Sequence, residues 1–245
     1  MTDRTRLDLA LVERGLVPTR ARARDAILRG CVTVDGRGVV APSAQVSTDA
    51  QIIVDDPAGR WVSRAALKLV EGLDRYGYDP AGRVALDVGA STGGFTEVLL
   101  DRGAAKVHAI DVGHGQLHPR LAADPRVVSI EGLNARDLSS EHVSGPIAAV
   151  VADVSFISLR LALPPALALA DAGAWGVFLV KPQFEVGREN IGKGGLVRDA
   201  ARARQAADDI AAWLASDMGW AVDGIAESPI AGGDGNREYV LGARK

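Results

Sequence analysis

From about residue 61 onward, short apolar runs alternate with longer segments in which apolar positions recur every three or four residues. Short apolar runs are typical of buried strands, and the longer period is typical of amphipathic helices. Strands are expected at residues 84–88, 106–111, 127–130, 148–153, 175–181, 221–227 and 238–242. Helices are expected at residues 63–76, 96–102, 161–170 and 200–218. This alternation predicts an α/β fold with a parallel sheet covered by helices on both faces, made mixed by a final hairpin.

The first part of the chain follows a different pattern, with two short helices before a small sheet. Thr19, a residue type that commonly caps helices, precedes the second helix. Asp35-Gly36 is a two-residue signal for a β-hairpin turn. The expected helices lie at residues 7–14 and 20–30, and a further strand at 51–54. We therefore predict three parts: a small α+β domain (1–56), a linker (57–62) and the α/β domain (63–245).

Composition places the chain among ordinary globular proteins, with 245 residues of which 47% are hydrophobic and 24% charged. A single cysteine, Cys31, excludes an internal disulfide framework and fits a reducing compartment. No apolar leader follows Met1, so we expect a cytoplasmic protein, and we expect it to be a monomer. The most apolar window, residues 161–180, is interrupted by two prolines and Asp171, which argues against a membrane span.

Positive charge is concentrated near the N-terminus, although the net charge of the chain is −3. Between residues 4 and 29, seven arginines accompany only three acidic residues. Two ordinary solvated helices would also carry such charges. Arginines clustered on short helices nevertheless favour contact with RNA phosphates, because these contacts depend on local charge. The candidate RNA-binding residues are Arg4, Arg6, Arg14, Arg20, Arg22, Arg24 and Arg29.

This segment resembles the S4 RNA-binding domain. The matching strings are Arg6-Leu-Asp-Leu-Ala-Leu-Val-Glu-Arg-Gly, followed by Leu-Val-Pro-Thr-Arg-Ala-Arg-Ala, and Ile27-Leu-Arg-Gly-Cys-Val-Thr-Val-Asp-Gly. The resemblance implies that the arginines lie on structured RNA, above all Arg14, Arg20, Arg22, Arg24 and Arg29.

A glycine-rich turn follows the first strand of the α/β domain, in Asp87-Val-Gly-Ala-Ser-Thr-Gly-Gly-Phe95. Such a turn leaves space and backbone N–H groups beside a ligand at the carboxyl edge of the sheet. Its spacing is not the Gly-x-Gly-x-x-Gly of dinucleotide sites, which argues against NAD. The next strand ends at Asp111, which is suited to accept ribose hydroxyls. Asn134 is either a contact for adenine or an ordinary turn residue.

These features are similar to those of class I S-adenosylmethionine-dependent methyltransferases. The resemblance implies S-adenosylmethionine as the cofactor. The candidate cofactor-binding residues are Asp87, Gly89, Ala90, Ser91, Thr92, Gly93, Gly94, Phe95, Asp111, Val112, Asn134 and Asp153.

Four charged residues stand at or near the ends of predicted elements: Lys68, Asp153, Lys181 and Glu238. Each alone is typical of a solvated surface charge, but Asp153 and Lys181 follow strands that end at the same sheet edge as the glycine turn. We expect Lys181, kept partly neutral by Lys68 and by burial, either to remove a proton from an acceptor hydroxyl or to hold its oxygen. Asp153 should orient Lys181, and Glu238 should fix Lys68 or the acceptor.

The strings around three of these residues are Val151-Ala-Asp-Val-Ser-Phe-Ile-Ser-Leu, Leu179-Val-Lys-Pro-Gln-Phe-Glu and Gly235-Asn-Arg-Glu. They resemble ribose 2′-O-methyltransferases of the FtsJ type, and from Arg6 to about Leu241 the chain is similar to the TlyA family of rRNA methyltransferases. The resemblance implies a catalytic tetrad of Lys68, Asp153, Lys181 and Glu238. It also implies methyl transfer from S-adenosylmethionine to a ribose 2′-hydroxyl, of a cytidine in 16S or 23S rRNA within 30S or 50S subunits.

Three other functions compete with this interpretation. A dehydrogenase of the same fold class is disfavoured by the glycine spacing. A membrane-active protein is suggested by the older name hemolysin for some TlyA members, yet no membrane-active segment is visible. A non-catalytic RNA-binding protein would not need the four charged residues. The four histidines, His108, His114, His118 and His142, form no recognisable ligand set, so we expect no metal.

Overall fold

The computed structural model describes residues 4–245, which divide into two compact units. The first unit ends at Arg60, and the second spans Trp61–Lys245. The division falls inside residues 57–62, the stretch expected to be a linker. Each unit has its own buried apolar core, and the second unit has one on each face of its sheet.

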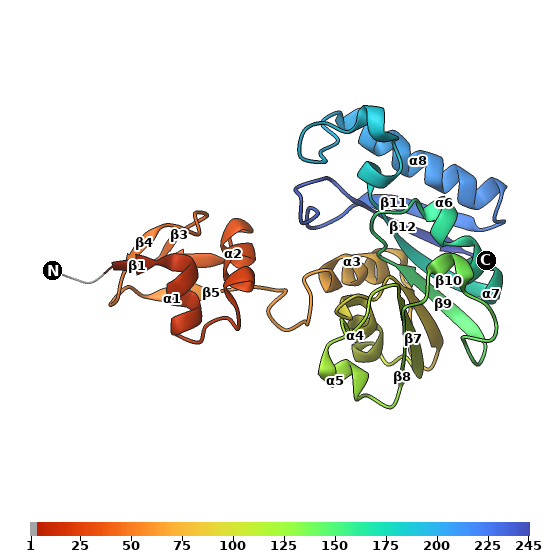
Figure 1. Cartoon of the computed structure of the whole chain (residues 1–245), viewed down its shortest axis with the longest axis horizontal. Helices are drawn as coiled ribbons and strands as arrows, with labels where there is room; N and C mark the ends of the chain where they lie inside the picture. The colour runs from red at the N-terminus through yellow and green to blue at the C-terminus, as the bar shows by residue number, and fades with distance from the viewer. Residues whose placement is uncertain (1–3) are drawn as a thin grey trace. The chain divides into compact units, whose positions relative to one another are not determined.

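The first unit packs two helices against short strands (Figure 1). Thr19 caps the second helix by accepting a hydrogen bond from the Arg22 backbone, and Asp35 and Gly36 adopt positive φ in the hairpin turn, so both predictions are confirmed. The elements are β1 (Arg4–Arg6), α1 (Leu7–Glu13), α2 (Arg20–Leu28), β2 (Val32–Val34), β3 (Arg37–Gly38), β4 (Gln45–Ser47) and β5 (Ile52–Val54). Strands β1 and β4 were not predicted because Arg-Thr-Arg and Gln-Val-Ser lack the apolar run that marks the equally short β2 and β5.

A seven-stranded mixed sheet forms the centre of the second unit, in the order β11-β12-β10-β9-β6-β7-β8. The five strands from β10 to β8 are parallel, while β12 runs antiparallel between β10 and β11. The predicted α/β class with a mixed sheet is confirmed. The strands are β6 (Val84–Val88), β7 (Lys106–Asp111), β8 (Val127–Glu131), β9 (Ile147–Ala152), β10 (Ala170–Val180), β11 (Ala221–Glu227) and β12 (Tyr239–Arg244).

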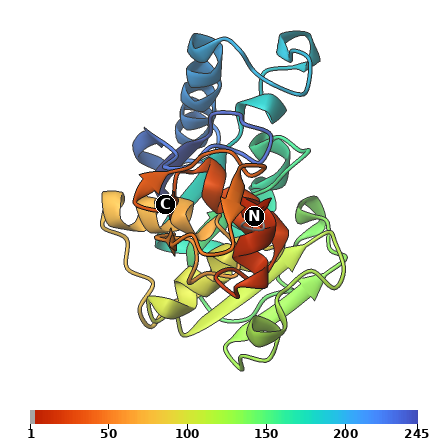
Figure 2. The ribbon, with the colours of Figure 1, turned by 90° about the vertical axis from the view of Figure 1, so that its left-hand side faces the viewer.

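Helices cover both faces of this sheet (Figure 1). The longest helix, α8, packs along β11 and is drawn in blue in Figures 1 and 2. The helices on one face are α3 (Ala66–Tyr76), α4 (Gly94–Asp101) and α5 (Pro119–Ala122). Those on the other face are α6 (Leu159–Ala162), α7 (Pro164–Leu169) and α8 (Ala200–Ser216).

The apolar stretch 161–170 differs from the single helix that its periodicity predicts. It holds parts of two short helices, α6 and α7, which meet at Pro164. Proline lacks a backbone N–H and is accommodated only in the first turn of a helix, so the chain ends one helix and starts another there. Strand β10 begins at Ala170, five residues before the predicted start, and its register against β9 shifts before Trp175.

Candidate active site

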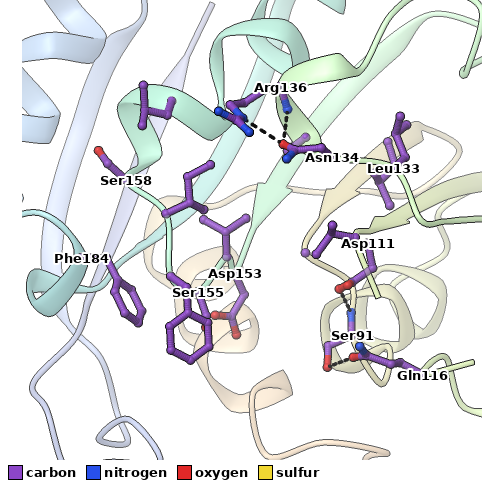
Figure 3. A pocket seen from close by; sticks show the side chains of 18 residues that line it. Ser91, Asp111, Gln116, Leu133, Asn134, Arg136, Asp153, Ser155, Ser158 and Phe184 are labelled. Atoms are coloured by element: carbon purple, nitrogen blue, oxygen red, sulfur yellow. Dashed lines mark hydrogen bonds between the residues drawn. The ribbon is translucent and has the colours of Figure 1, made fainter. Parts of the chain in front are cut away.

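A cleft of about 920 Å³ lies at the carboxyl ends of β6, β7 and β9 (Figure 3). One part of its wall is apolar and the other part carries carboxylates, amides and hydroxyls. The apolar residues include Ile110, Val112, Leu133, Val154, Ile157 and Leu161. The polar residues include Ser91, Asp111, Gln116, Asn134, Asp153 and Ser155. A half-apolar cleft with few polar groups is typical of a site for an organic ligand.

The glycine turn between β6 and α4 has the shape that only glycine permits. Gly89 has a φ of 83°, and a Cβ there would lie 2.9 Å from the carbonyl oxygen of Asp153. Gly93 has a φ of 95°, and a Cβ there would lie 2.3 Å from the side chain of Leu121. The turn therefore lies tightly against the end of β9, and it brings the backbone of Ser91 to the cleft wall.

Asp111, at the end of β7, is held rigidly on the wall of the cleft (Figure 3). Its two carboxylate oxygens accept hydrogen bonds from the backbone N–H groups of Ser91 (2.8 Å) and Gly113 (2.7 Å). Each oxygen retains a lone pair for a further donor, because a carboxylate accepts about four hydrogen bonds. Gln116, which the sequence analysis did not single out, accepts from the Ser91 hydroxyl at 3.2 Å.

Asn134 serves the local turn and also lines the cleft. Its side-chain oxygen accepts hydrogen bonds from the backbone N–H (3.1 Å) and Nε (3.2 Å) of Arg136, and so caps the short 3₁₀ helix Ala135–Asp137 (Figure 3). Asn134 therefore has the role of a turn residue, and the same hydrogen bonds fix its side-chain amide on the wall of the cleft.

Asp87, beneath the glycine turn, is fully buried. The Thr96 hydroxyl donates to its Oδ2 at 2.6 Å, and Oδ1 has no hydrogen-bond partner among residues 4–245. Burial, with smaller contributions from the carboxylates of Asp153 and Asp111, raises the pKa of Asp87 from 3.8 to about 7. Asp87 thus lies beneath the cleft, whose own wall carries the carboxylates of Asp111 and Asp153, an arrangement that favours a ligand with positive charge.

Asp87 should make the stability of the protein depend on pH. The unfolded carboxyl ionises near 3.8 and the folded one only near 7, so wild-type stability falls as pH rises across that window. Asp87→Asn removes this effect, and its stability relative to wild type should rise by about 4 kcal/mol between pH 4 and pH 8. Thermal melts over this range measure the difference, with exposed Asp79→Asn as the control. A difference independent of pH would contradict the assignment.

The four charged residues of the predicted tetrad form two ion pairs in the structure. Lys181 Nζ lies 2.6 Å from Asp153 Oδ1, and Lys68 Nζ lies 2.5 Å from Glu238 Oε2. Lys181 also donates to the Ser155 hydroxyl at 2.8 Å. Glu238 compensates the charge of Lys68, which reduces the effect that Lys68 was expected to have on Lys181.

A second cavity, of about 160 Å³, adjoins the first and shares Gly89, Ser91, Asp153 and Ser155 with it. Lys181 lines this smaller cavity, which we call the acceptor cavity. Lys68 and Glu238 are buried, 6% and 3% exposed, and belong to the lining of neither cavity. The structure therefore brings Asp153 and Lys181 to the surface of the site and keeps Lys68 and Glu238 in the protein interior.

The loop after β9 carries residues that the sequence analysis did not single out. Ser155 contacts Lys181 and lines both cavities. Phe156 is 92% exposed, has a φ of 64° and lies with its ring centroid 5.2 Å from that of Phe184. An exposed aromatic in a left-handed conformation at a cleft is rare, and it offers a flat apolar surface to a ligand. The available signal was an aromatic residue three positions after Asp153.

The candidate RNA-binding arginines divide into a group held by carbonyls or aspartates of the first unit and a second group, Arg4, Arg22 and Arg24. Arg14 donates to the backbone carbonyls of Ser47, Thr48 and Ala50. Arg29 pairs with two aspartates, and Arg6 and Arg20 both pair with the buried Asp8. Arg4 and Arg24 are exposed, and Arg22 is half-buried. Much of the predicted basic surface is thus engaged within the unit, and charge alone could not reveal this.

Two classes of site are not found in the described part of the chain. Among residues 4–245, no three histidine, cysteine, aspartate or glutamate side chains gather closely enough to hold a metal ion. Within the same residues, every helix is too short or too polar to cross a membrane.

Comparison with known proteins agrees with this geometry. The sequence model of the family of FtsJ-like methyltransferases matches residues 61–245, and the sequence model of the S4 domain family matches residues 5–52. The N-methyltransferase NodS of Bradyrhizobium japonicum, solved with S-adenosyl-L-homocysteine, has the same fold (TM-score 0.53, 17% identity, covering 78% of this chain and 89% of that one). The sheet, the glycine turn and the cleft thus define a methyltransferase of class I fold.

Two other proteins are similar along the whole chain. The 16S/23S rRNA (cytidine-2′-O)-methyltransferase TlyA of Mycobacterium tuberculosis is 49% identical over 100% of this chain and 91% of its own length. A protein of Streptococcus thermophilus solved under the name hemolysin is 36% identical, with a TM-score of 0.76, covering 100% of this chain and 90% of that one. The chain belongs to the TlyA family of FtsJ-like methyltransferases with an S4 domain.

Proposed function

We propose that the protein transfers a methyl group from S-adenosylmethionine to the ribose 2′-hydroxyl of a cytidine in ribosomal RNA, within the 30S subunit, the 50S subunit or both. The observation that carries the proposal is the Lys181–Asp153 pair on the wall of a cavity that shares four residues with the larger cleft. The similarity to a 16S/23S rRNA (cytidine-2′-O)-methyltransferase over the full chain supports the choice of acceptor. We expect the protein to act as a monomer in the cytoplasm.

The residues of the cleft fit S-adenosylmethionine better than a dinucleotide. Asp111 offers lone pairs for ribose hydroxyls, and the apolar wall around Leu133 suits an adenine ring. The carboxylates of Asp111 and Asp153 on the cleft wall favour a cation and would repel the pyrophosphate of NAD. S-adenosylmethionine supplies an electrophilic methyl group when bound, so the protein itself has only to position and deprotonate the acceptor.

Lys181 is the residue that would hold or deprotonate the acceptor hydroxyl. Asp153 and Ser155 fix the position of its Nζ atom at the acceptor cavity. An ammonium has three N–H bonds, and two of these directions are occupied by the contacts to Asp153 and Ser155. The third would be directed to the 2′-oxygen, either as a donor that holds it or, after proton loss, as the base that takes its proton.

The exposed ring of Phe156 would serve the base of the acceptor nucleotide. An extruded base exposes its π-face, and stacking on an aromatic side chain stabilises it by about 1–3 kcal/mol without sequence preference. Phe156 lines the cleft beside Ser155, so a base stacked on it would leave its ribose near the acceptor cavity.

The proposal is tested by incubating purified protein with labelled S-adenosylmethionine and ribosomal subunits from a strain that lacks the gene, and then mapping ribose methylation. We expect a 2′-O-methylcytidine that depends on the protein and on S-adenosylmethionine. Lysis of erythrocytes by the same protein without any methylation would overturn the proposal in favour of a membrane-active function. Reduction or oxidation of a nicotinamide cofactor in its place would favour a dehydrogenase.

The two groups of arginines should behave differently in RNA binding. Arg24 is exposed, so Arg24→Gln should weaken subunit RNA binding and reduce the slope of log affinity against log salt by about 1. Arg14 holds three backbone carbonyls, so Arg14→Gln should chiefly lower the melting temperature of the first unit. Filter binding at several salt concentrations, together with thermal melts, measures both effects. Equal salt slopes for Arg24→Gln and wild type would remove Arg24 from the RNA-binding surface.

A further inference from the structure

Two loops that leave neighbouring parallel strands run side by side at the active site. The β9 loop (residues 153–158) carries Asp153, and the β10 loop (residues 181–185) carries Lys181. Residues in the same order along the two loops contact one another. Lys181 meets Asp153 and Ser155, and further along the rings of Phe156 and Phe184 lie 5.2 Å apart.

Glu185 makes the last contact of this series. Its Oε2 accepts a hydrogen bond from the Ser158 hydroxyl at 2.6 Å, and its Oε1 accepts one from the Leu159 backbone N–H at 2.9 Å. Leu159 begins helix α6, where the backbone N–H groups have no partner inside the helix. Glu185 therefore joins the end of the β10 loop to the end of the β9 loop through both of its oxygens. The side chain is partly buried, and burial raises its pKa.

The β9 loop needs such a restraint. Phe156 has a φ of 64°, a conformation that costs a residue with a side chain about 1–2 kcal/mol. A strained residue persists only where its surroundings fix the backbone on both sides. On one side the backbone N–H of Asp153 is bonded to Val88, and on the other side Glu185 holds Ser158 and Leu159.

We propose that Glu185 is a positioning residue that sets the register between the β9 loop and the β10 loop, so that Lys181 meets Asp153 and Ser155 at the acceptor cavity. The inference rests on the proposed methyl transfer, in which Lys181 handles the acceptor hydroxyl. Glu185 itself lines neither the cleft nor the acceptor cavity in the described structure, so its effect passes through the residues that it holds.

Three variants test the proposal in the full chain. Glu185→Ala removes both contacts and should lower kcat for subunit methylation at least about tenfold, since small displacements of catalytic groups have large effects on rate. Its Kd for S-adenosylmethionine should rise by a smaller factor than kcat falls, because Asp111 and the glycine turn are untouched and only the β9-loop part of the cleft wall is loosened. Glu185→Gln should restore kcat, since its amide oxygen accepts from Leu159 and its NH₂ donates to a rotated Ser158 hydroxyl. Exposed Glu189→Ala is the control.

Hydrogen exchange gives a readout that does not depend on activity. Amides of residues 153–159 should exchange faster in Glu185→Ala than in wild type, and at the wild-type rate in Glu185→Gln. If the wild-type protein methylated no RNA, the proposed function would fail, but hydrogen exchange would still test whether Glu185 sets the register of the β9 and β10 loops. Wild-type exchange and wild-type kcat in Glu185→Ala would overturn the inference. So would a loss of kcat that Glu185→Gln shares in full, because that pattern indicates a requirement for the charge.

Discussion

Lys181→Ala should abolish methyl transfer and leave the binding of S-adenosylmethionine intact. A side chain placed to move or hold a reacting proton contributes about 10²–10⁴-fold to rate, so kcat should fall at least about 100-fold. Cofactor affinity should not fall, because the loss of Lys181 leaves the carboxylate of Asp153 without its cation, 2.6 Å away in the wild type. An uncompensated negative charge at the cleft favours a cationic ligand. Methylation kinetics and calorimetric titration of the cofactor measure the two effects.

Lys106→Ala is the matched control for this experiment. Lys106 begins β7, at the opposite end of the strand from Asp111, and it contacts the Ser144 hydroxyl. Its loss should change neither kcat nor cofactor affinity. A Lys181→Ala protein that lost cofactor binding and methyl transfer to the same extent would assign Lys181 a structural role, and the proposed handling of the acceptor hydroxyl would have to be abandoned.

The sequence was sufficient to predict which sheet edge holds the active site, because parallel strands all end at the same edge. Side chains just after parallel strands gather at one edge, so the positions of Gly89, Asp111, Asp153 and Lys181 at strand ends predicted their neighbourhood. Apolar runs were long enough to identify these strands. The same argument could not distinguish which acid pairs with which lysine, because that depends on the side-chain directions of α3 and β12.

Contacts made by long side chains could not be predicted from periodicity. Helical spacing assigns Arg14 and Arg29 to a face, but a guanidinium on a flexible stem reaches backbone carbonyls or aspartates far away in sequence. The positive φ of Phe156 is similarly invisible, because glycine and asparagine are the residue types that indicate that conformation. These are the points at which tertiary contacts override the local pattern.

The buried Lys68–Glu238 pair should reveal its role when its two charges are removed separately and together. Lys68→Met leaves Glu238, 3% exposed, without a counter-charge, and breaking a buried pair in this way costs about 3–5 kcal/mol. For a unit of this size the melting temperature should fall by roughly 6–20 °C. Arg75→Met is the control, because it breaks the exposed pair with Glu71 on the same helix and should cost at most about 0.5 kcal/mol.

The double variant Lys68→Met/Glu238→Leu separates stability from catalysis. Apolar residues of similar volume replace a buried ion pair at no cost or with a gain, so the melting temperature should return to at least the wild-type value. Stability therefore gives little reason to keep this pair beside the active site. We expect methyl transfer to stay at least about 100-fold below wild type, which would show that the two charges contribute to the reaction and not only to stability. If activity returned together with stability, Lys68 and Glu238 would be scaffold, and the catalytic group would reduce to Lys181 and Asp153.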